Sequence, residues 1–144
     1  ARGDLVYAVD ALTYAADPVL PGEWLARYPS GQFKFVGRDI CELGAWPDVD
    51  AVINLAAETH VDNSLNSSDR FVRTNVLGVQ HLLELTRARA QHGMPTFIQI
   101  STDEVFGDVP TGETDETAPL NPSSPYAAPW PTTSRNGAVV SVSG

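Results

Sequence analysis

Ala51-Val52-Ile53-Asn54-Leu55 and Thr96-Phe97-Ile98-Gln99-Ile100 are two short, nearly apolar runs, and one long amphipathic segment lies between them. Strands this continuously apolar are typical of parallel sheets that are covered on both faces. The segment between them, about residues 69–91, carries an apolar stripe at helical spacing. The stripe consists of Val72, Val76, Val79 and Leu83. Strand, helix and strand in this order predict a right-handed βαβ unit within a doubly wound α/β sheet.

Further elements flank this unit on both sides. Leu5-Val6-Tyr7-Ala8-Val9 and Phe33-Lys34-Phe35-Val36 each predict a strand, and a weaker helix is expected over residues 23–28. Ser68 is a plausible N-cap for the long helix, which Gly93 and Pro95 would end. A long loop, residues 103–125, follows the last strand, and long loops in compact domains are more often functional than idle. To the tail, residues 129–144, we assign no structure.

Composition limits the classes of function that this chain can have. Its 144 residues include 9 Lys and Arg against 18 Asp and Glu, a formal net charge of −9, which argues against a nucleic-acid partner. No window approaches the ~18–20 consecutive apolar residues of a membrane span. Ala1-Arg2-Gly3-Asp4 has no apolar signal region, and the single cysteine, Cys41, cannot form an internal disulfide. We therefore expect a soluble, acidic domain in the cytoplasm, without a membrane partner.

Ligands of open parallel sheets bind outside the carboxyl ends of the strands. That rule selects four positions: Asp10, residues 39–40, residues 56–60 and residues 101–104. An acidic residue at such a strand end often accepts hydrogen bonds from the ribose of an adenine dinucleotide, but it can equally start an ordinary loop. The sequence contains no G-x-G-x-x-G phosphate loop. If residues 5–9 form the second strand of a dinucleotide fold, the first strand and that loop belong upstream of Ala1.

The densest polar cluster is Ser101-Thr102-Asp103-Glu104, at the end of the last predicted strand. Two adjacent carboxylates can divide general-acid and general-base work if their environments give them different protonation states. Adjacent Asp and Glu are also common on solvated surfaces, and we weigh the two interpretations about equally. The histidines have no metal-ligand spacing, and we interpret them as structural.

Several short motifs occur along the chain in a fixed order. They are Asp10-Ala11-Leu12-Thr13-Tyr14-Ala15, Asp39-Ile40, Leu55-Ala56-Ala57-Glu58-Thr59-His60-Val61-Asp62, Thr74-Asn75-Val76, Ser101-Thr102-Asp103-Glu104-Val105-Phe106-Gly107 and Pro122-Ser123-Ser124-Pro125-Tyr126. Over residues 5–128 the chain resembles the dTDP-glucose 4,6-dehydratases, which are extended short-chain dehydrogenase/reductase enzymes. Thr102-Asp103-Glu104 is the most specific motif, because related epimerases and decarboxylases usually lack both carboxylates. The resemblance implies a partial, Rossmann-like NAD-binding domain over residues 1–128 and leaves residues 129–144 unassigned.

The resemblance also implies a cofactor, NAD, and residues that would hold it. Asp10 would bind the adenosine ribose, with Leu12 and Thr13 beside it, and Asp39 and Ile40 would flank the adenine. The residues that would line the NAD channel are Leu55, Ala56, Ala57, Glu58 and Thr59, and Thr74 would touch the cofactor. Thr59 would also reach the substrate, a nucleotide sugar such as dTDP-glucose. Full-length relatives are expected to be homodimers.

The family reaction gives each residue of the acidic motif a role. Tyr126 would take the proton of the sugar C4 hydroxyl while hydride passes from C4 to NAD, and Thr102 would bond the C4 oxygen. Glu104 would remove the C5 proton, and Asp103 would protonate the C6 hydroxyl, which leaves as water. The hydride then returns to C6, so that NAD is recycled.

The chain departs from the family pattern near its end. Where the family has Lys four residues after the catalytic Tyr126, this chain has Trp130, between Pro129 and Pro131. The prolines oppose a helix there, and the loss of likeness after Ala128 suggests a reading-frame slip or a cloning scar. We therefore expect that these 144 residues do not catalyse the reaction. The alternatives are a related NAD-dependent nucleotide-sugar epimerase, a GDP-mannose-type dehydratase, or a non-catalytic remnant.

Overall fold

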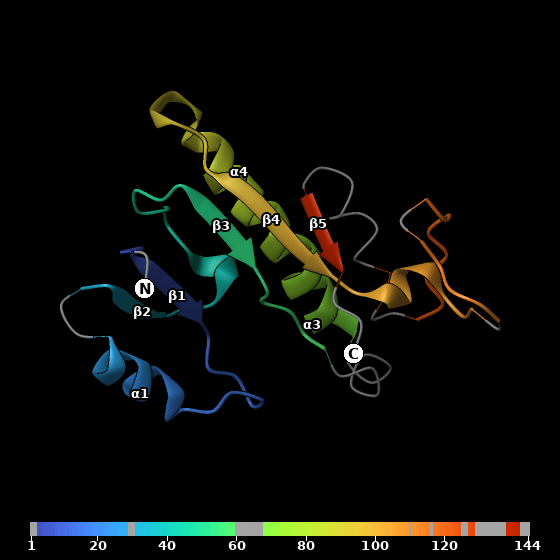
Figure 1. The fold of residues 1–144 in the computed structure, drawn as a ribbon, viewed down its shortest axis with the longest axis horizontal. Helices are drawn as coiled ribbons and strands as arrows, with labels where there is room; N and C mark the ends of the chain where they lie inside the picture. The colour runs from blue at the N-terminus through green and yellow to red at the C-terminus, as the bar shows by residue number, and fades with distance from the viewer. Residues whose placement is uncertain are drawn as a thin grey trace. The chain divides into compact units, whose positions relative to one another are not determined.

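The computed structural model describes residues 3–28, 31–59, 68–109, 111–115, 117–124, 127–128 and 138–141. The chain divides into two compact units, residues 1–43 and residues 44–144. Both units are built from parallel strands with helices beside them, as Figure 1 shows. The predicted α/β class is therefore confirmed.

The first unit contains a pair of parallel strands, β1 (Val6–Asp10) and β2 (Phe33–Gly37), with Val6 opposite Phe33 and Asp10 opposite Gly37. Both strands lie where the apolar runs predict them. Helix α1 (Leu20–Arg27) connects them and begins three residues earlier than the predicted residue 23. Proline is favoured in the first turn of a helix, where its missing N–H has no partner to lose, and Pro21 occupies that turn.

Helix α1 packs only loosely on its strands. The ring of Trp24 meets that of Phe33 edge-on, with centroids 5.7 Å apart, and no residue of α1 is buried. Across the strand pair, the Nζ of Lys34 donates a hydrogen bond to the hydroxyl of Tyr7 (3.1 Å) and lies over its ring. Several large apolar side chains of this unit remain exposed, among them Leu5, Val6, Leu12, Tyr14, Val19, Leu20, Trp24, Leu25 and Tyr28.

The second unit holds a three-stranded parallel sheet in the order β3-β4-β5. Strands β3 (Ala51–Asn54) and β4 (Thr96–Ser101) match the two apolar runs that predict the βαβ unit. Strand β5 (Ala138–Ser141) comes from the tail and pairs with the carboxyl half of β4, Val139 opposite Gln99. The sequence predicts no structure for these four residues, because two valines are too short a run to predict a strand.

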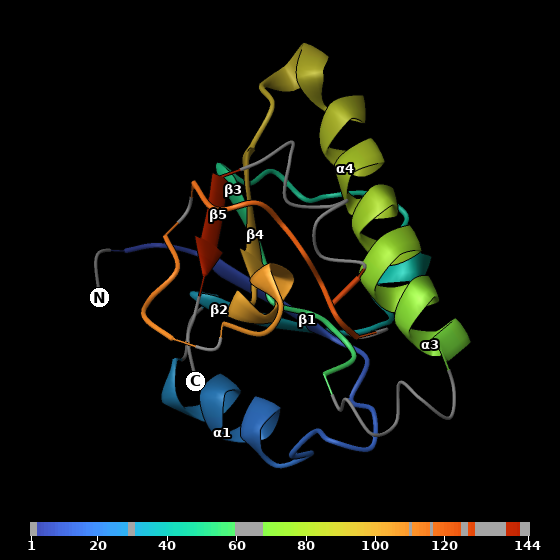
Figure 2. The ribbon, with the colours of Figure 1, turned by 90° about the vertical axis from the view of Figure 1, so that its right-hand side faces the viewer.

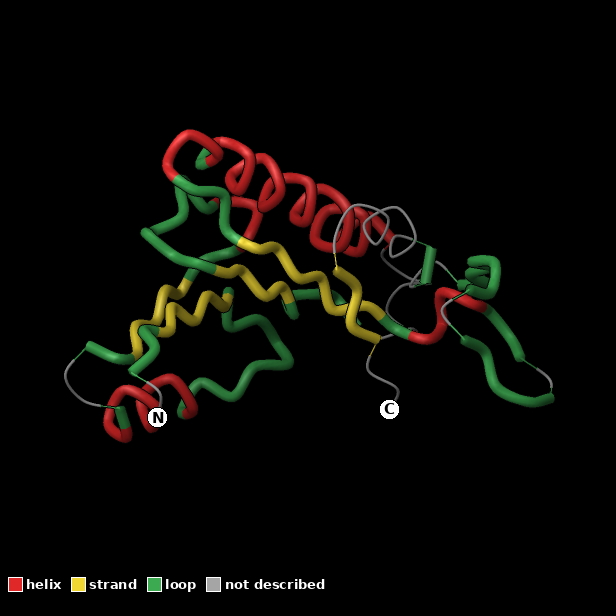
Figure 3. Tube along the Cα trace, turned by 45° about the horizontal axis from the view of Figure 1, so that its top comes forward, coloured by secondary structure: helices red, strands yellow, loops and turns green. Residues whose placement is uncertain are grey.

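The predicted long helix is present as a continuous series of helical turns. It consists of α3 (Ser68–Val72), the π-helical η2 (Arg73–Gly78) and α4 (Val79–Ala88), followed by a 3₁₀ turn, η3 (Ala90–His92). The turns run along one face of the β3-β4-β5 sheet (Figure 2), and from Ser68 to Ala88 they follow one another without interruption (Figure 3). Gly93, with a φ of +94°, ends the series, as its position predicts.

The buried face of this helix differs from the predicted stripe. Val72 is 48% exposed, although Val79 is fully buried. The residues that are buried are Phe71, Asn75, Gly78, Val79, Leu82 and Thr86. The prediction of the buried face from apolar residues at a period of 3.6 is wrong for two reasons. A π-turn shifts the helical period, and the buried face includes polar residues.

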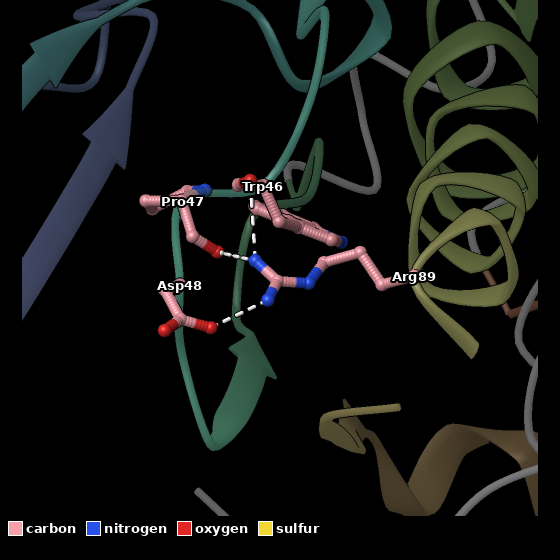
Figure 4. A network of polar contacts seen from close by, with 4 residues as sticks. All are labelled: Trp46, Pro47, Asp48 and Arg89. Atoms are coloured by element: carbon pink, nitrogen blue, oxygen red, sulfur yellow. Dashed lines mark hydrogen bonds and ion pairs between the residues drawn. The ribbon is translucent and has the colours of Figure 1, made fainter. Parts of the chain in front are cut away.

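An arginine at the end of α4 connects this helix by hydrogen bonds to the segment that precedes β3. The guanidinium of Arg89 donates to the backbone carbonyls of Trp46 and Pro47 and to the carboxylate of Asp48 (2.5 Å), as Figure 4 shows. The indole of Trp46 in turn donates to the hydroxyl of Thr86 (3.1 Å). These contacts fix the start of β3 against the helix. In the part of the chain that the structure describes, no helix is long and apolar enough to cross a membrane.

Candidate functional site

The loop that begins with residues 55–59 follows β3 at its carboxyl end, where the family resemblance predicts a cofactor channel. Asn54, the last residue of β3, is 4% exposed and accepts a hydrogen bond from the amide of Ala56 (3.2 Å). Its amide group donates to Oε1 of Gln99 on β4 (2.9 Å), and Gln99 donates to the carbonyl of Ile100 (2.8 Å). The start of the loop is therefore set by a buried, hydrogen-bonded pair of amides.

A second point of the same loop is held by Asn75, on the π-helical turn η2. Asn75 is fully buried, and its carboxamide oxygen accepts from the amide N–H of Glu58 (2.9 Å). Its Nδ2 donates to the carbonyl of Glu58 (3.0 Å). One side chain thus pairs both backbone groups of one loop residue. Asn75 is not among the residues predicted for the site, although an amide inside an amphipathic helix is a signal that the sequence contains.

The predicted channel residues therefore lie on a loop that is fixed at two points. Leu55 (70% exposed) and Thr59 are exposed, and the other three are half-buried. Those three are Ala56, Ala57 and Glu58. Thr74 is half-buried and directly precedes Asn75.

The acidic motif forms a tight turn at the carboxyl end of β4. We call the 3₁₀ turn η4 (Asp103–Phe106), together with Thr102 before it, the acid turn. The hydroxyl of Thr102 accepts from the amide of Glu104 (3.4 Å) and donates to the carboxylate of Asp103 (3.3 Å). Both carboxylates are exposed. They stand next to each other at a strand end, which is the geometry that the motif predicts.

The acid turn and the loop after β3 share one piece of the core. Val105, in the turn, is 5% exposed and packs with Phe71 of α3, which is 1% exposed. Ala57, from the loop, and Phe106 pack against the same cluster. The fold of the second unit therefore brings the predicted cofactor loop and the two carboxylates to one end of the sheet.

In the first unit, Asp10 ends β1 and starts a turn. Its Oδ1 accepts from the amide of Leu12 (2.7 Å), while its backbone carbonyl accepts from the amide of Arg38 (3.0 Å). Leu12 has a φ of +49°, a left-handed conformation that is unusual for leucine. Asp10, Leu12 and Thr13 are all exposed, so that a ligand can reach them.

Asp39 and Ile40 follow β2 in the same unit. The carboxylate of Asp39 accepts from the amide of Cys41 (2.9 Å) and caps the short 3₁₀ turn η1 (Ile40–Glu42). Ile40 is 6% exposed, so its side chain lies in the interior rather than on an open surface. Asp10 and Asp39 therefore stand at the carboxyl ends of the paired strands β1 and β2.

Some of the predicted site falls on residues that lie outside the described ones. Tyr126, the predicted base for the C4 hydroxyl, is one of these, as is the segment 60–62. Close to Tyr126, the hydroxyl of Ser124 accepts from the amide of Ala127 (3.0 Å), and its carbonyl accepts from the amide of Ala128 (3.0 Å). Among the described residues, no group of three or more His, Cys, Asp or Glu side chains is arranged to hold a metal ion.

The model of the family described as GDP-mannose 4,6 dehydratase matches residues 25–129, which is more than half of the sequence. The chain belongs to this family.

Several similar proteins carry a more specific name. The chain is 43% identical to the dTDP-glucose 4,6-dehydratase of Streptomyces niveus over 132 residues, and 51% identical to that of Streptomyces antibioticus over 129 residues. These matches cover 88% and 86% of this chain, but only 37% and 36% of the relatives. The chain therefore spans little more than a third of the length of the enzymes that it resembles. The identities confirm the predicted resemblance to the dTDP-glucose 4,6-dehydratases.

A solved structure supports the same relationship. The crystal structure of DesIV, the dTDP-glucose 4,6-dehydratase of Streptomyces venezuelae with NAD and TYD bound, is 31% identical and superimposes with a TM-score of 0.76. The match covers 98% of this chain and 46% of DesIV. The relative with a similar backbone was thus crystallised with the cofactor that the sequence analysis expects.

Proposed function

We propose that this chain forms the cofactor-binding part and the acid turn of an NAD-dependent dTDP-glucose 4,6-dehydratase. One observation carries the proposal: Asp103 and Glu104 stand side by side at the end of β4, on the same core cluster as the loop that follows β3. The relatives named above act as this class of enzyme, and the paired carboxylates are what an elimination of water needs.

The described residues fit a dinucleotide cofactor. Asp10 is exposed at the end of β1, where its carboxylate can accept hydrogen bonds from ribose hydroxyls. Ala56 and Ala57 are small enough to let a cofactor lie across the end of β3, and Asn54 and Asn75 hold the loop that carries them. NAD, when bound, would supply the hydride chemistry at C4 and C6 of the sugar.

The chain's own residues would move the protons. Tyr126 takes the proton of the C4 hydroxyl, and Thr102 hydrogen-bonds the C4 oxygen. The ketone formed at C4 makes the C5 proton acidic, and Glu104 removes it. Asp103 gives a proton to the C6 hydroxyl, so that it departs as water. The support for this division of work is the family resemblance together with the adjacency of the two carboxylates in the acid turn.

We expect that the 144-residue chain by itself converts no substrate. The position that holds Lys in the family pattern is Trp130, and without that cation an ordinary tyrosine, with a pKa of about 10, is ionised in only about one molecule in a thousand at pH 7. An assay with dTDP-glucose and NAD should therefore give no 4-keto product. Robust turnover would mean that the departure at Trp130 is harmless.

Cofactor binding tests the proposal more directly than turnover does. Isothermal titration of NAD into the chain should show binding, and Asp10→Ala should weaken it by at least tenfold, since a charge-assisted hydrogen bond is worth about 1.5–3 kcal/mol. Asp17→Ala is the matched control, because Asp17 is also exposed and accepts from the amide two residues on, that of Val19 (2.9 Å). Absence of NAD binding, or equal losses in both variants, would favour the non-catalytic remnant.

A further inference from the structure

Gly107 ends the acid turn at a point where a second segment of the chain crosses it. Its φ is +73°, and its amide donates to the carbonyl of Glu104 (3.1 Å). A Cβ at this position would lie 2.2 Å from the carbonyl oxygen of Asn121 and 3.4 Å from the carbonyl carbon. Both the backbone conformation and the lack of space therefore require glycine here.

Asn121 holds the acid turn from the other side. Its amide donates to the carbonyl of Val105 (2.9 Å), so the carbonyls of Glu104 and Val105 are both paired, one by Gly107 and one by Asn121. The side chain of Val105 is buried beneath the turn. The turn is thus fixed by the core below it and by what we call the Gly107–Asn121 crossing.

We propose that the Gly107–Asn121 crossing positions Asp103 and Glu104 for the reaction, and that Gly107 and Asn121 are positioning residues of this site. This inference rests on the proposed function, which gives the carboxylates their roles. The backbone of the turn sets where both exposed side chains begin, and the hydroxyl of Thr102, also in the turn, donates to the carboxylate of Asp103. A misplacement of about 1 Å can cost about 10²-fold in rate, and the crossing is what prevents such a shift.

The crossing also connects the acid turn with the segment that leads to Tyr126. Asn121 precedes Tyr126 by only a few residues, and Ser124, between them, ties down the amides of Ala127 and Ala128. A turn that slipped relative to Asn121 would therefore lose its register with that segment as well. A merely stabilising loop contact would not have this consequence.

A pair of glycine substitutions separates the collision from the backbone strain. Gly107→Ala introduces both, whereas Gly112→Ala introduces only the strain, because Gly112 has a φ of +85° and nothing lies within 4 Å of its Cβ position. The experiment is NMR on the 144-residue chain with NAD, in which dTDP-glucose is titrated and the amide signals of residues 102–104 are followed. We expect Gly107→Ala to weaken the response of these signals at least fivefold, while Gly112→Ala leaves it within twofold of the unsubstituted chain.

A second pair of variants covers the case in which Gly107→Ala does not fold. Asn121→Pro deletes the N–H that Val105 accepts, and Asn121→Ala keeps it. Because Asn121 precedes Pro122, its backbone is biased toward the extended conformations that proline can adopt. Loss of the sugar response in Asn121→Pro, with retention in Asn121→Ala, supports the crossing. An equal sugar response of the two variants in either pair would contradict the positioning role of the crossing.

Hydrogen exchange keeps this inference distinct from the proposed function. If the unsubstituted chain does not respond to dTDP-glucose, the proposed function fails, and the positioning role fails with it. The crossing itself is then judged by the amide of Asn121, whose protection should exceed that of Gly112 by about fivefold or more, as expected for one hydrogen bond. An unprotected Asn121 amide contradicts the crossing, whatever the sugar does.

Discussion

The carboxamide of Asn75 pairs with both the amide N–H and the carbonyl of Glu58, at 2.9 and 3.0 Å. It does so from a π-helical turn, a rare element that occurs often at functional sites. In this chain the turn presents a fully buried amide to the loop that follows β3. One buried side chain thus joins the helix to the proposed cofactor loop through two hydrogen bonds.

Asn75→Ala should destabilise the chain by about 2–4 kcal/mol, because it leaves the backbone amide and carbonyl of Glu58 without their partner. Urea unfolding followed by circular dichroism measures the change. Gln80→Ala, which removes an exposed amide from the same helix, is the control and should stay within about 0.5 kcal/mol. A loss at Asn75 no larger than the loss at Gln80 would mean that this contact does not support the loop.

The strands of this chain could be predicted from the sequence, but the buried polar contacts could not. Runs such as residues 51–55 and 96–100 predict strands through their continuous apolarity. The expected burial on both faces is wrong for β3, because Val52 is 8% exposed whereas its neighbour Ile53 is 57% exposed. Asn54, Gln99 and Asn75 are buried as well, yet only the three-dimensional structure supplies the partners that make their burial favourable. For the same reason, the apolar stripe misidentified which face of the helix is buried.

Leu12→Gly should change the stability of the chain by less than about 1 kcal/mol, since it relieves a left-handed leucine but also frees the unfolded chain. It should nevertheless weaken NAD binding, because the partly exposed side chain beside Asp10 is lost. Leu25→Gly, in the exposed helix α1, should instead cost about 1 kcal/mol and leave NAD binding unchanged. Calorimetry measures the NAD affinity of the two variants, and urea unfolding measures their stability. Equal NAD affinity in both variants would mean that Leu12 is not part of the cofactor site.

Arg89→Ala should cost about 1–3 kcal/mol, because two backbone carbonyls and a carboxylate lose their donor. Asp48→Ala should cost about 0.5 kcal/mol or less, since the Asp48 side chain is 98% exposed and exposed ion pairs contribute little. Arg87→Ala is a second control, because its partner Glu84 is also exposed. If Asp48→Ala lowers the stability as much as Arg89→Ala does, the ion pair, and not the bonds to the carbonyls, holds the segment before β3 against the helix.

Thr117→Val should raise the pKa of Asp115. The hydroxyl of Thr117 donates to this carboxylate (2.6 Å), its amide does so as well (2.9 Å), and these bonds hold the pKa below the usual 3.8. Because the pKa is lower in the folded chain, the bonds stabilise the fold at pH values above the ordinary pKa of Asp115. This contribution to stability is lost as the pH falls through the lowered pKa of the folded state. Carboxyl ¹³C titration measures the shift. Thr111→Val, in the same loop, should leave Asp115 unchanged; an equal shift in both variants would contradict the assignment.

The acid turn illustrates what the sequence can and cannot reveal about a site. The order Thr102-Asp103-Glu104 after an apolar run predicts adjacent carboxylates at a strand end, and the structure has them there. Gly107 could be recognised only as one glycine among others, because its need for glycine comes from Asn121, which is distant in sequence. Contacts of this kind depend on how the loop returns, and local sequence patterns carry no information about that.

A crystal structure of the chain with NAD and dTDP-glucose tests the proposed function most directly. We expect the adenosine ribose to lie at Asp10 and the carboxylates of Asp103 and Glu104 to face the C5–C6 side of the hexose, with Tyr126 at its C4 hydroxyl. A sugar bound away from the acid turn, or a cofactor remote from Asp10, would contradict it.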